Sequence, residues 1–222
     1  MTAKTHLHLA TLIPAHIPPA DIIAALHDHN NALSIQSLTT SHRRLPSTEP
    51  EILKDTYWHP PDLNPVCTYE VKEVITMVPG VGNWAKKEIS FPSCFQDTPT
   101  GLKTRANAPA GVLLRAEFRV IKGGADEGEV EGEGEGIGLA EWVLAEDIEL
   151  QCAWYMMPFV RKSMEAAHKD ICRKIVEKVE MTRRQDELAR TAAKGKGRAK
   201  SPTEEKKPER SREELPDKIF YG

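Results

Sequence analysis

Residues 157–182 read MPFVRKSMEAAHKDICRKIVEKVEMT, with apolar side chains at intervals of three or four positions. The apolar stripe consists of Met157, Val160, Met164, Ala167, Ile171, Ile175 and Val179. An α-helix has 3.6 residues per turn, so this spacing places the whole stripe on one face and leaves the charged residues on the others. The pattern therefore predicts an amphipathic helix of about 25–30 residues.

The sequence before this helix alternates with a period of two, which is typical of β-strands. The predicted strands cover residues 5–13, 67–78, 84–96, 112–121 and 138–151. A short helix is expected from Pro19 to about His29, and residues 32–45 fit a second short helix that turns into a strand from Leu38. DTPTG at 97–101 is a hairpin-turn signal, and Pro92 inside a strand predicts an edge position or a bulge. The predicted order is strand, helix, antiparallel strands and a long terminal helix.

The charge of the chain is unevenly distributed. The 222 residues have a formal net charge of -3. Residues 123–138 hold seven of the 14 glycines and six acidic residues, whereas residues 183–222 carry 12 Lys+Arg against 8 Asp+Glu. We therefore expect one domain at 1–182, with a Gly/Glu loop inserted at 123–138. We expect a charged tail at 183–222, disordered after about Leu188.

Composition excludes several classes of protein. No apolar run approaches the ~20 residues of a membrane-spanning helix, and the glycines have no collagen period. The first residues, MTAKTHLHLATLIPAHIPP, lack the continuous apolar core of a secretory signal. Cys67, Cys94, Cys152 and Cys172 are too few and too scattered for a disulfide scaffold, so we expect thiols in a reducing compartment. The predicted location is the cytoplasm, with the nucleus as a second possibility, and not the secretory route.

The order of elements resembles the START-like helix-grip superfamily, which includes lipid-transfer domains, polyketide cyclases and pollen-allergen-like proteins. The runs VPGVGNWAKKEISFPSCFQDTPTGLKTRANAPAGVLLRAEFRV (78–120) and MPFVRKSMEAAHKDICRKIVEKVE (157–180) are similar to a fungal family of unknown function in that superfamily. The resemblance implies an α+β fold in which a curved antiparallel sheet wraps around a long C-terminal helix. It also implies an apolar cavity between the sheet and the helix.

The predicted function is noncatalytic binding of an apolar small molecule or lipid in that cavity. The residues expected to line it are Leu114, Phe118, Trp142, Met157, Phe159, Val160, Met164 and Ile171. Methionine is flexible and polarizable, which suits an adaptable apolar pocket. The alternative explanation of the same stripe is an ordinary packed core. We predict no cofactor, no metal and no stable membrane insertion.

Two other functions remain open. A cyclase- or aromatase-like enzyme would need at least two polar groups in the interior, for example His42, Tyr69 or Arg115. An interaction module would act through the tail, where Lys194, Lys196, Arg198 and Lys200 form a small basic cluster. This cluster is too slight for us to expect nucleic-acid binding.

Two pairs of chemically active side chains stand at suggestive spacings. His6 and His8 share one face of the first strand, but no third metal ligand is identifiable, so we expect uncoordinated histidines. His168 and Cys172 are neighbours on one helical face. A catalytic thiolate would also need an oxyanion hole and an orienting third group. We therefore predict no catalytic residue.

Overall fold

The computed structural model describes residues 1–60, 64–76, 86–123 and 140–198. The elements, in chain order, are β1 (Thr2–Ile13), α1 (Pro19–His27), α2 (His29–Ile35), β2 (Thr39–Arg44), α3 (Pro50–Leu53), β3 (Cys67–Thr76), β4 (Lys86–Thr98), β5 (Gly101–Ala108), the 3₁₀ turn η2 (Pro109–Gly111), β6 (Val112–Lys122), β7 (Trp142–Ala153) and α4 (Met157–Arg198). The chain divides into two units, Met1–Arg183 and Arg184–Gly222.

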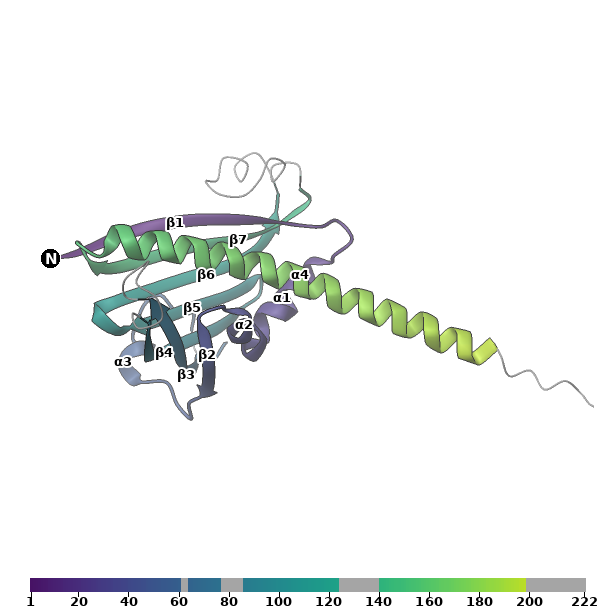
Figure 1. Ribbon diagram of the computed structural model, residues 1–222, viewed down its shortest axis with the longest axis horizontal. Helices are drawn as coiled ribbons and strands as arrows, with labels where there is room; N and C mark the ends of the chain where they lie inside the picture. Colours follow the sequence, from purple (N-terminus) through teal and green to yellow (C-terminus); the bar gives the residue numbers. More distant parts are fainter. Residues whose placement is uncertain (61–63, 77–85, 124–139, 199–222) are drawn as a thin grey trace, which may run out of the picture. The chain divides into compact units, whose positions relative to one another are not determined.

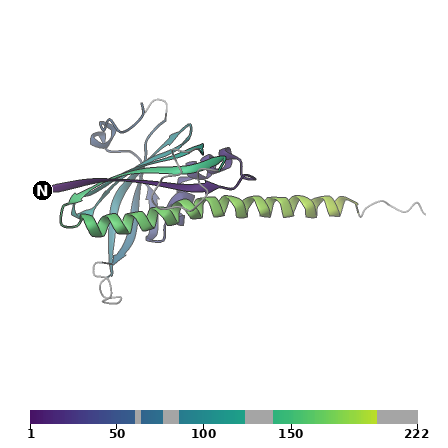
Figure 2. The same cartoon turned by 90° about the horizontal axis from the view of Figure 1, so that it is seen from above.

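The strands form one seven-stranded sheet in the order β1-β7-β6-β5-β4-β3-β2, and every neighbouring pair is antiparallel. Figures 1 and 2 show this sheet curving, with the first half of α4 lying across one face. We call the face toward α4 the inner face and the opposite one the outer face. This architecture confirms the predicted α+β helix-grip fold.

The core lies between the inner face and α4. Alternation along β7 directs Leu144, Ile148 and Leu150 inward, and all three are almost completely buried. Ile171, Ile175 and Val179 of the predicted stripe, with Val176 beside them, belong to the same hydrophobic cluster as the strands. A second cluster surrounds Val160 nearer the start of α4. Burial of the stripe explains why a helix with charged outer faces is held against this sheet.

Pro92 occupies the kind of position that its chemistry predicts. β4 pairs with β3 through Pro92, which lies opposite Glu70, but its pairing with β5 begins only at Ser93. This part of β4 is therefore paired on one side, where a residue without an N–H is tolerated.

Helix α4 is longer than the sequence predicts. It has 42 residues and continues to Arg198, so the expectation of disorder does not hold for residues 189–198. Alanine, arginine and lysine make up seven of these ten residues and are good helix formers, whereas Thr191, Gly195 and Gly197 are poorer ones. Residues 199–222 of the tail, residues 124–138 of the Gly/Glu insertion and the side chains of the basic cluster lie outside the described residues. No helix in the described ranges carries an apolar run sufficient to span a membrane.

Candidate functional site

A buried polar cluster lies between β7 and α4. His168 Nδ1 donates a hydrogen bond to Glu146 Oε1 at 2.5 Å, and Cys172 Sγ donates to Glu146 Oε2 at 3.4 Å. Glu146 and Cys172 are 0% exposed and His168 is 7% exposed. We call these three residues the interior polar cluster.

The backbone positions of these three residues direct their side chains into the space between β7 and α4. Glu146 stands on β7 between the inward residues Leu144 and Ile148, and β7 is hydrogen-bonded to β1 on one side and β6 on the other. Side chains alternate along a strand, so the carboxylate must point toward α4. His168 and Cys172 are one turn apart on the buried side of α4 and meet it there.

The charges around His168 favour its protonated form. Burial by itself would lower the pKa of His168, but the charge and hydrogen bond of Glu146, together with the charge of Glu73, outweigh burial and raise it. Glu73 reaches the same interior from β3, and burial raises the pKa of its carboxyl, against a hydrogen bond from Thr39. The carboxyl groups of Glu146 and Glu73 therefore both favour the protonated form of His168.

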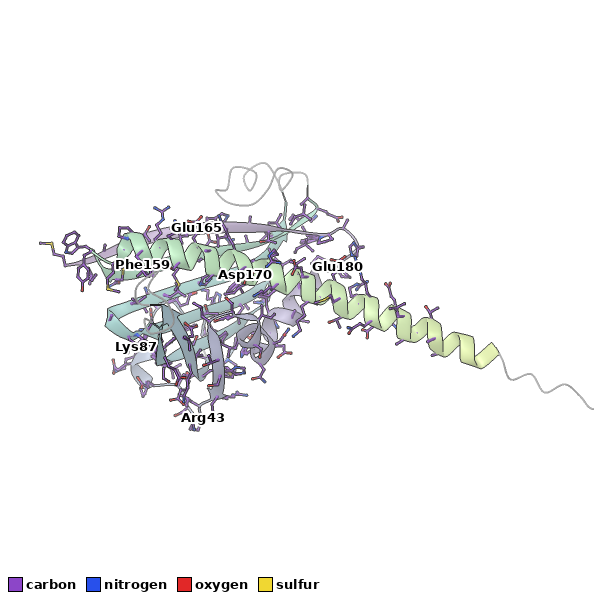
Figure 3. All side chains as sticks on the ribbon, viewed as in Figure 1. Arg43, Lys87, Phe159, Glu165, Asp170 and Glu180 are labelled. Atoms are coloured by element: carbon purple, nitrogen blue, oxygen red, sulfur yellow. The ribbon has the colours of Figure 1, made fainter. Side chains whose placement is uncertain are left out.

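Apolar groups surround this charge. The ring of Phe118, on β6, is stacked against His168 with the ring centroids 6.5 Å apart. Seven of the eight residues predicted to line a cavity are buried or half-buried and belong to the two clusters under α4: Leu114, Phe118, Trp142, Met157, Val160, Met164 and Ile171. Phe159 differs, because 50% of it is exposed. Figure 3 labels Phe159 near the start of α4. The contact of these residues with a ligand stays a prediction.

A second inner group extends from β3 to β4. His29 Nε2 donates to Asp97 Oδ1 at 2.9 Å, and the Tyr69 hydroxyl lies 3.4 Å from His29 Nδ1. The ring of His42 stands edge-on to Tyr69. Burial raises the pKa of the Tyr69 hydroxyl. His42 and Tyr69 thus lie on the inner side, as the enzyme hypothesis requires.

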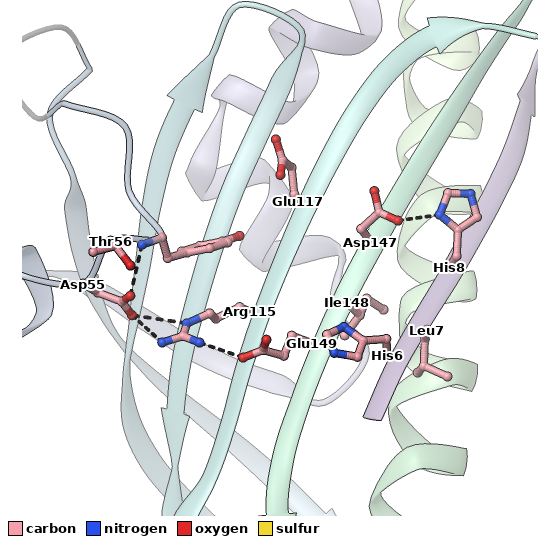
Figure 4. A pocket seen from close by; sticks show the side chains of 11 residues that line it. His6, Leu7, His8, Asp55, Thr56, Arg115, Glu117, Asp147, Ile148 and Glu149 are labelled. Atoms are coloured by element: carbon pink, nitrogen blue, oxygen red, sulfur yellow. Dashed lines mark hydrogen bonds and ion pairs between the residues drawn. The ribbon is translucent and has the colours of Figure 1, made fainter. Parts of the chain in front are cut away.

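Arg115, the third candidate for that role, is on the outer face, so its prediction as an interior group is wrong. Alternation along β6 turns Leu114 and Ala116 inward and Arg115 outward. There Arg115 lines an open groove of about 540 Å³ together with residues of β1, β7 and the loop after α3. Figure 4 shows the groove. It is lined by His6, Leu7, His8, Asp55, Thr56, Tyr57, Arg115, Glu117, Asp147, Ile148 and Glu149.

Ion pairs satisfy most of the charges in this groove. Arg115 contacts Asp55 at 2.7 Å and Glu149 at 2.7 Å. Burial would raise the pKa of Asp55, but hydrogen bonds from Tyr57 N–H and Arg115 and the charges of Arg115 and Arg105 lower it. His8 donates to Asp147 at 2.5 Å, and Arg119 pairs with the same carboxylate. The arrangement ties the loop after α3 to the sheet, which is a structural task.

The His6–His8 spacing leads to no metal site. His8 is engaged with Asp147, and His6 is exposed at the rim of the groove. Among the described residues, no group of three or more His, Cys, Asp or Glu side chains is arranged to hold a metal ion.

Residues 2–181 match the family described as Domain of unknown function (DUF7053). The chain belongs to this family. No curated protein matches it.

Two solved structures are similar to the DUF7053 domain over most of their length. One is TTHA0849 from Thermus thermophilus, with 12% sequence identity, a TM-score of 0.47, and coverage of 80% of this chain and 99% of that chain. The other is the Zhui aromatase/cyclase from Streptomyces sp. R1128, with 14% identity, a TM-score of 0.45, and coverage of 80% and 94%.

The sequence contains one further signal for the site of this DUF7053 domain. By charge alone, Glu146 groups with Glu141 as an acidic residue flanking the apolar residues of the last strand. Strict alternation instead places Glu146 in line with Trp142, Leu144 and Ile148, on the buried face. A carboxylate at an inward position of a strand is rarely left without a partner. The sequence shows its partners, His168 and Cys172, only as two neighbours on a helix.

Proposed function

We propose that the DUF7053 domain of this chain binds a small, largely apolar molecule between α4 and the inner face of the sheet, and that His168 and Glu146 hold its polar group. The observation that carries the proposal is the hydrogen-bonded pair of His168 and Glu146, which is buried beside apolar side chains under α4. A buried ion pair adds little net stability compared with apolar side chains of similar size. Titratable groups in such surroundings are concentrated at functional sites.

The chemistry of the surroundings defines the ligand class. Ligand sites in proteins are mainly apolar walls with a few polar groups that fix orientation. Phe118, Val160, Met164 and Ile171 provide such walls beside the pair. A protonated His168 donates hydrogen bonds, so the preferred ligand is an apolar molecule that ends in a carboxyl or hydroxyl group.

A fluorescent fatty acid, cis-parinaric acid, tests the proposal. The wild-type chain should bind one molecule, and native mass spectrometry of the purified chain should detect a carried apolar compound that the probe displaces. Met164→Trp puts a larger side chain where the ligand is proposed to lie and should abolish binding. His168→Gln should weaken it about tenfold, the equivalent of one hydrogen bond to a charged group.

Glu165→Gln is the matched control, because Glu165 lies on the same helix but pairs with Lys169 at the surface. Its affinity for the probe should equal that of the wild type. Unchanged affinity in Met164→Trp, in a protein whose circular dichroism matches the wild type, would contradict the proposal.

General acid–base catalysis is a second candidate function. The observation that favours it is the hydrogen bond from His168 Nδ1 to Glu146, because a carboxylate that orients an imidazole is a common arrangement in acid–base sites. The thiol of Cys172 donates a hydrogen bond to the other carboxylate oxygen of Glu146. If the domain is an enzyme, the carried compound will be converted on incubation with the wild type. His168→Gln will then retain the compound unchanged.

A further inference from the structure

Exposed aromatic side chains gather where β7 turns into α4. Trp154, Tyr155 and Phe159 are 64%, 69% and 50% exposed, and they fall within six consecutive residues. Met1, at the adjoining start of β1, is also exposed. The remaining exposed large apolar side chains in the described ranges are dispersed: Leu12, Leu38, Leu53, Met181 and Leu188. We call Trp154, Tyr155 and Phe159 the aromatic patch.

The patch is held in a defined conformation. Met156 N–H donates to Ala153 O at 2.9 Å, and Phe159 N–H donates to Met156 O at 3.1 Å, so the turn leads directly into the first turn of α4. The Trp154 and Tyr155 rings lie edge to face, 6.1 Å apart. Water-exposed aromatic rings on an ordered turn lose little conformational entropy when they are buried against another surface.

The charges beside the patch have one sign. Arg161 and Lys162 are exposed in the next turn of α4, and no acidic residue occurs between Glu149 and Glu165. Lys162 follows Phe159 by three positions, so both project from one side of the helix. The end of β7 is flanked by the start of β1 at Thr2 and by the turn η2 before β6. Neither of these two segments contains an acidic residue.

The size of the patch argues against a protein partner. An aromatic side chain has about 150–250 Å² of surface, so three that are half to two-thirds exposed offer about 300–400 Å². A stable protein interface needs about 800 Å² from each partner. Tryptophan and tyrosine are enriched where an apolar environment meets water, at the headgroup level of a bilayer. Basic residues beside them are attracted to anionic lipids.

We propose that the aromatic patch, with Arg161 and Lys162, docks this chain on the surface of an anionic phospholipid bilayer, with the aromatic rings inserted at the headgroup level. The surface is independent of the ligand proposed for the interior. It adds reversible contact with a membrane to a domain whose described helices do not span one.

Co-sedimentation of the full chain with vesicles tests this docking. We expect binding to phosphatidylcholine vesicles that contain phosphatidylserine, and much weaker binding to phosphatidylcholine alone. Trp154→Ser/Tyr155→Ser/Phe159→Ser should lower the affinity at least tenfold. Arg161→Gln/Lys162→Gln should lower it roughly tenfold, for phosphatidylserine vesicles only. The matched control is Leu12→Ser/Leu53→Ser/Leu188→Ser, which removes exposed apolar side chains elsewhere and should bind as the wild type does.

Fluorescence assigns the contact to the patch. Brominated lipids should quench tryptophan emission in the wild type, and Trp154→Phe should abolish the quenching while binding persists. Vesicle binding that survives the aromatic triple substitution would overturn the proposal, because the basic tail would then be responsible. So would an absence of binding to phosphatidylserine vesicles. Self-association that the same triple substitution abolishes, without vesicle binding, would overturn it in favour of a second copy.

Discussion

Glu146 occupies an inward position of β7 whose nearest inward neighbours, Leu144 and Ile148, are apolar. A carboxylate removed from water is tolerated when its oxygens are hydrogen-bonded and its charge is paired. His168 and Cys172 supply both conditions, one on each oxygen. The pair is therefore stable as a unit, although either side chain, if charged and buried without the other, would destabilise the fold.

Single and double substitutions should separate these effects. Glu146→Ala leaves His168 buried beside an empty site and should lower the free energy of unfolding by about 3–5 kcal/mol. Glu146→Leu/His168→Leu removes both charges and should recover most of that loss, while abolishing binding of the fatty-acid probe. Urea denaturation measures the stabilities. A double variant as unstable as the single one would show that the pair serves the fold, and would weaken the case for a binding site.

At the scale of an element, the β4–β5 hairpin depends on a glycine. A Cβ on Gly101 would lie 2.1 Å from the backbone oxygen of Phe118, across the β5–β6 pairing. His27, at the end of α1, donates from Nε2 to Thr98 O at 3.2 Å and to Gly101 O at 2.8 Å. The hairpin end therefore connects the helical excursion to the sheet.

Gly101→Ala should destabilise the domain by about 1–3 kcal/mol, because backbone rather than a flexible side chain must move. Gly111→Ala is the comparison, since a Cβ there meets nothing within 4 Å and encounters only the unfavourable φ of +72°. That change should cost about 1 kcal/mol. Thermal unfolding followed by circular dichroism measures both. Equal melting temperatures for Gly101→Ala and the wild type would contradict the close approach.

At the scale of the whole molecule, stability should depend on pH at two ends of the range. The folded pKa of His168 is raised above the ordinary 6.5. Its protonated form therefore contributes stability that is complete below about pH 6.5 and is lost as the pH rises through the folded pKa. The folded pKa of Asp55 is lowered below 3.8, so its contribution is present above that value and is lost as the pH falls through the folded pKa.

Urea denaturation of variants across the pH range isolates each contribution. The difference in unfolding free energy between the wild type and His168→Gln should shrink on the alkaline side. The difference between the wild type and Asp55→Asn should shrink on the acid side. A difference for His168→Gln that grows with rising pH would contradict the sign of the shift.

Much of the fold was predictable, and the site was partly so. The alternation of residues 5–13, 67–78 and 112–121 and the stripe from Met157 predicted strands and a helix where the structure has them. Local periodicity suffices for this, because a face that is buried must be apolar. Neighbouring positions on α4 also suggested that His168 and Cys172 meet. Their common partner Glu146 is 22 and 26 residues away, and only the packing of α4 on β7 brings it to them.

Arg115 illustrates the same limit. Its charge and its place in a clear strand are visible in the sequence, but its partners Asp55 and Glu149 lie 60 and 34 residues away. Alternation along the strand already places Arg115 opposite Leu114 and Phe118, so its prediction as an interior group conflicted with the period of the strand. What the sequence does not show is that the loop after α3 supplies its partner Asp55.

The sequence alone determined which segments form strands and which form the terminal helix, because hydrophobic periodicity is a property of neighbours along the chain. It also determined which side chains can be charged. Only the tertiary structure decided which charges are buried together and which aromatic rings remain in water. Those outcomes depend on contacts between residues far apart in the chain, and the sheet order and the placement of α4 create these contacts.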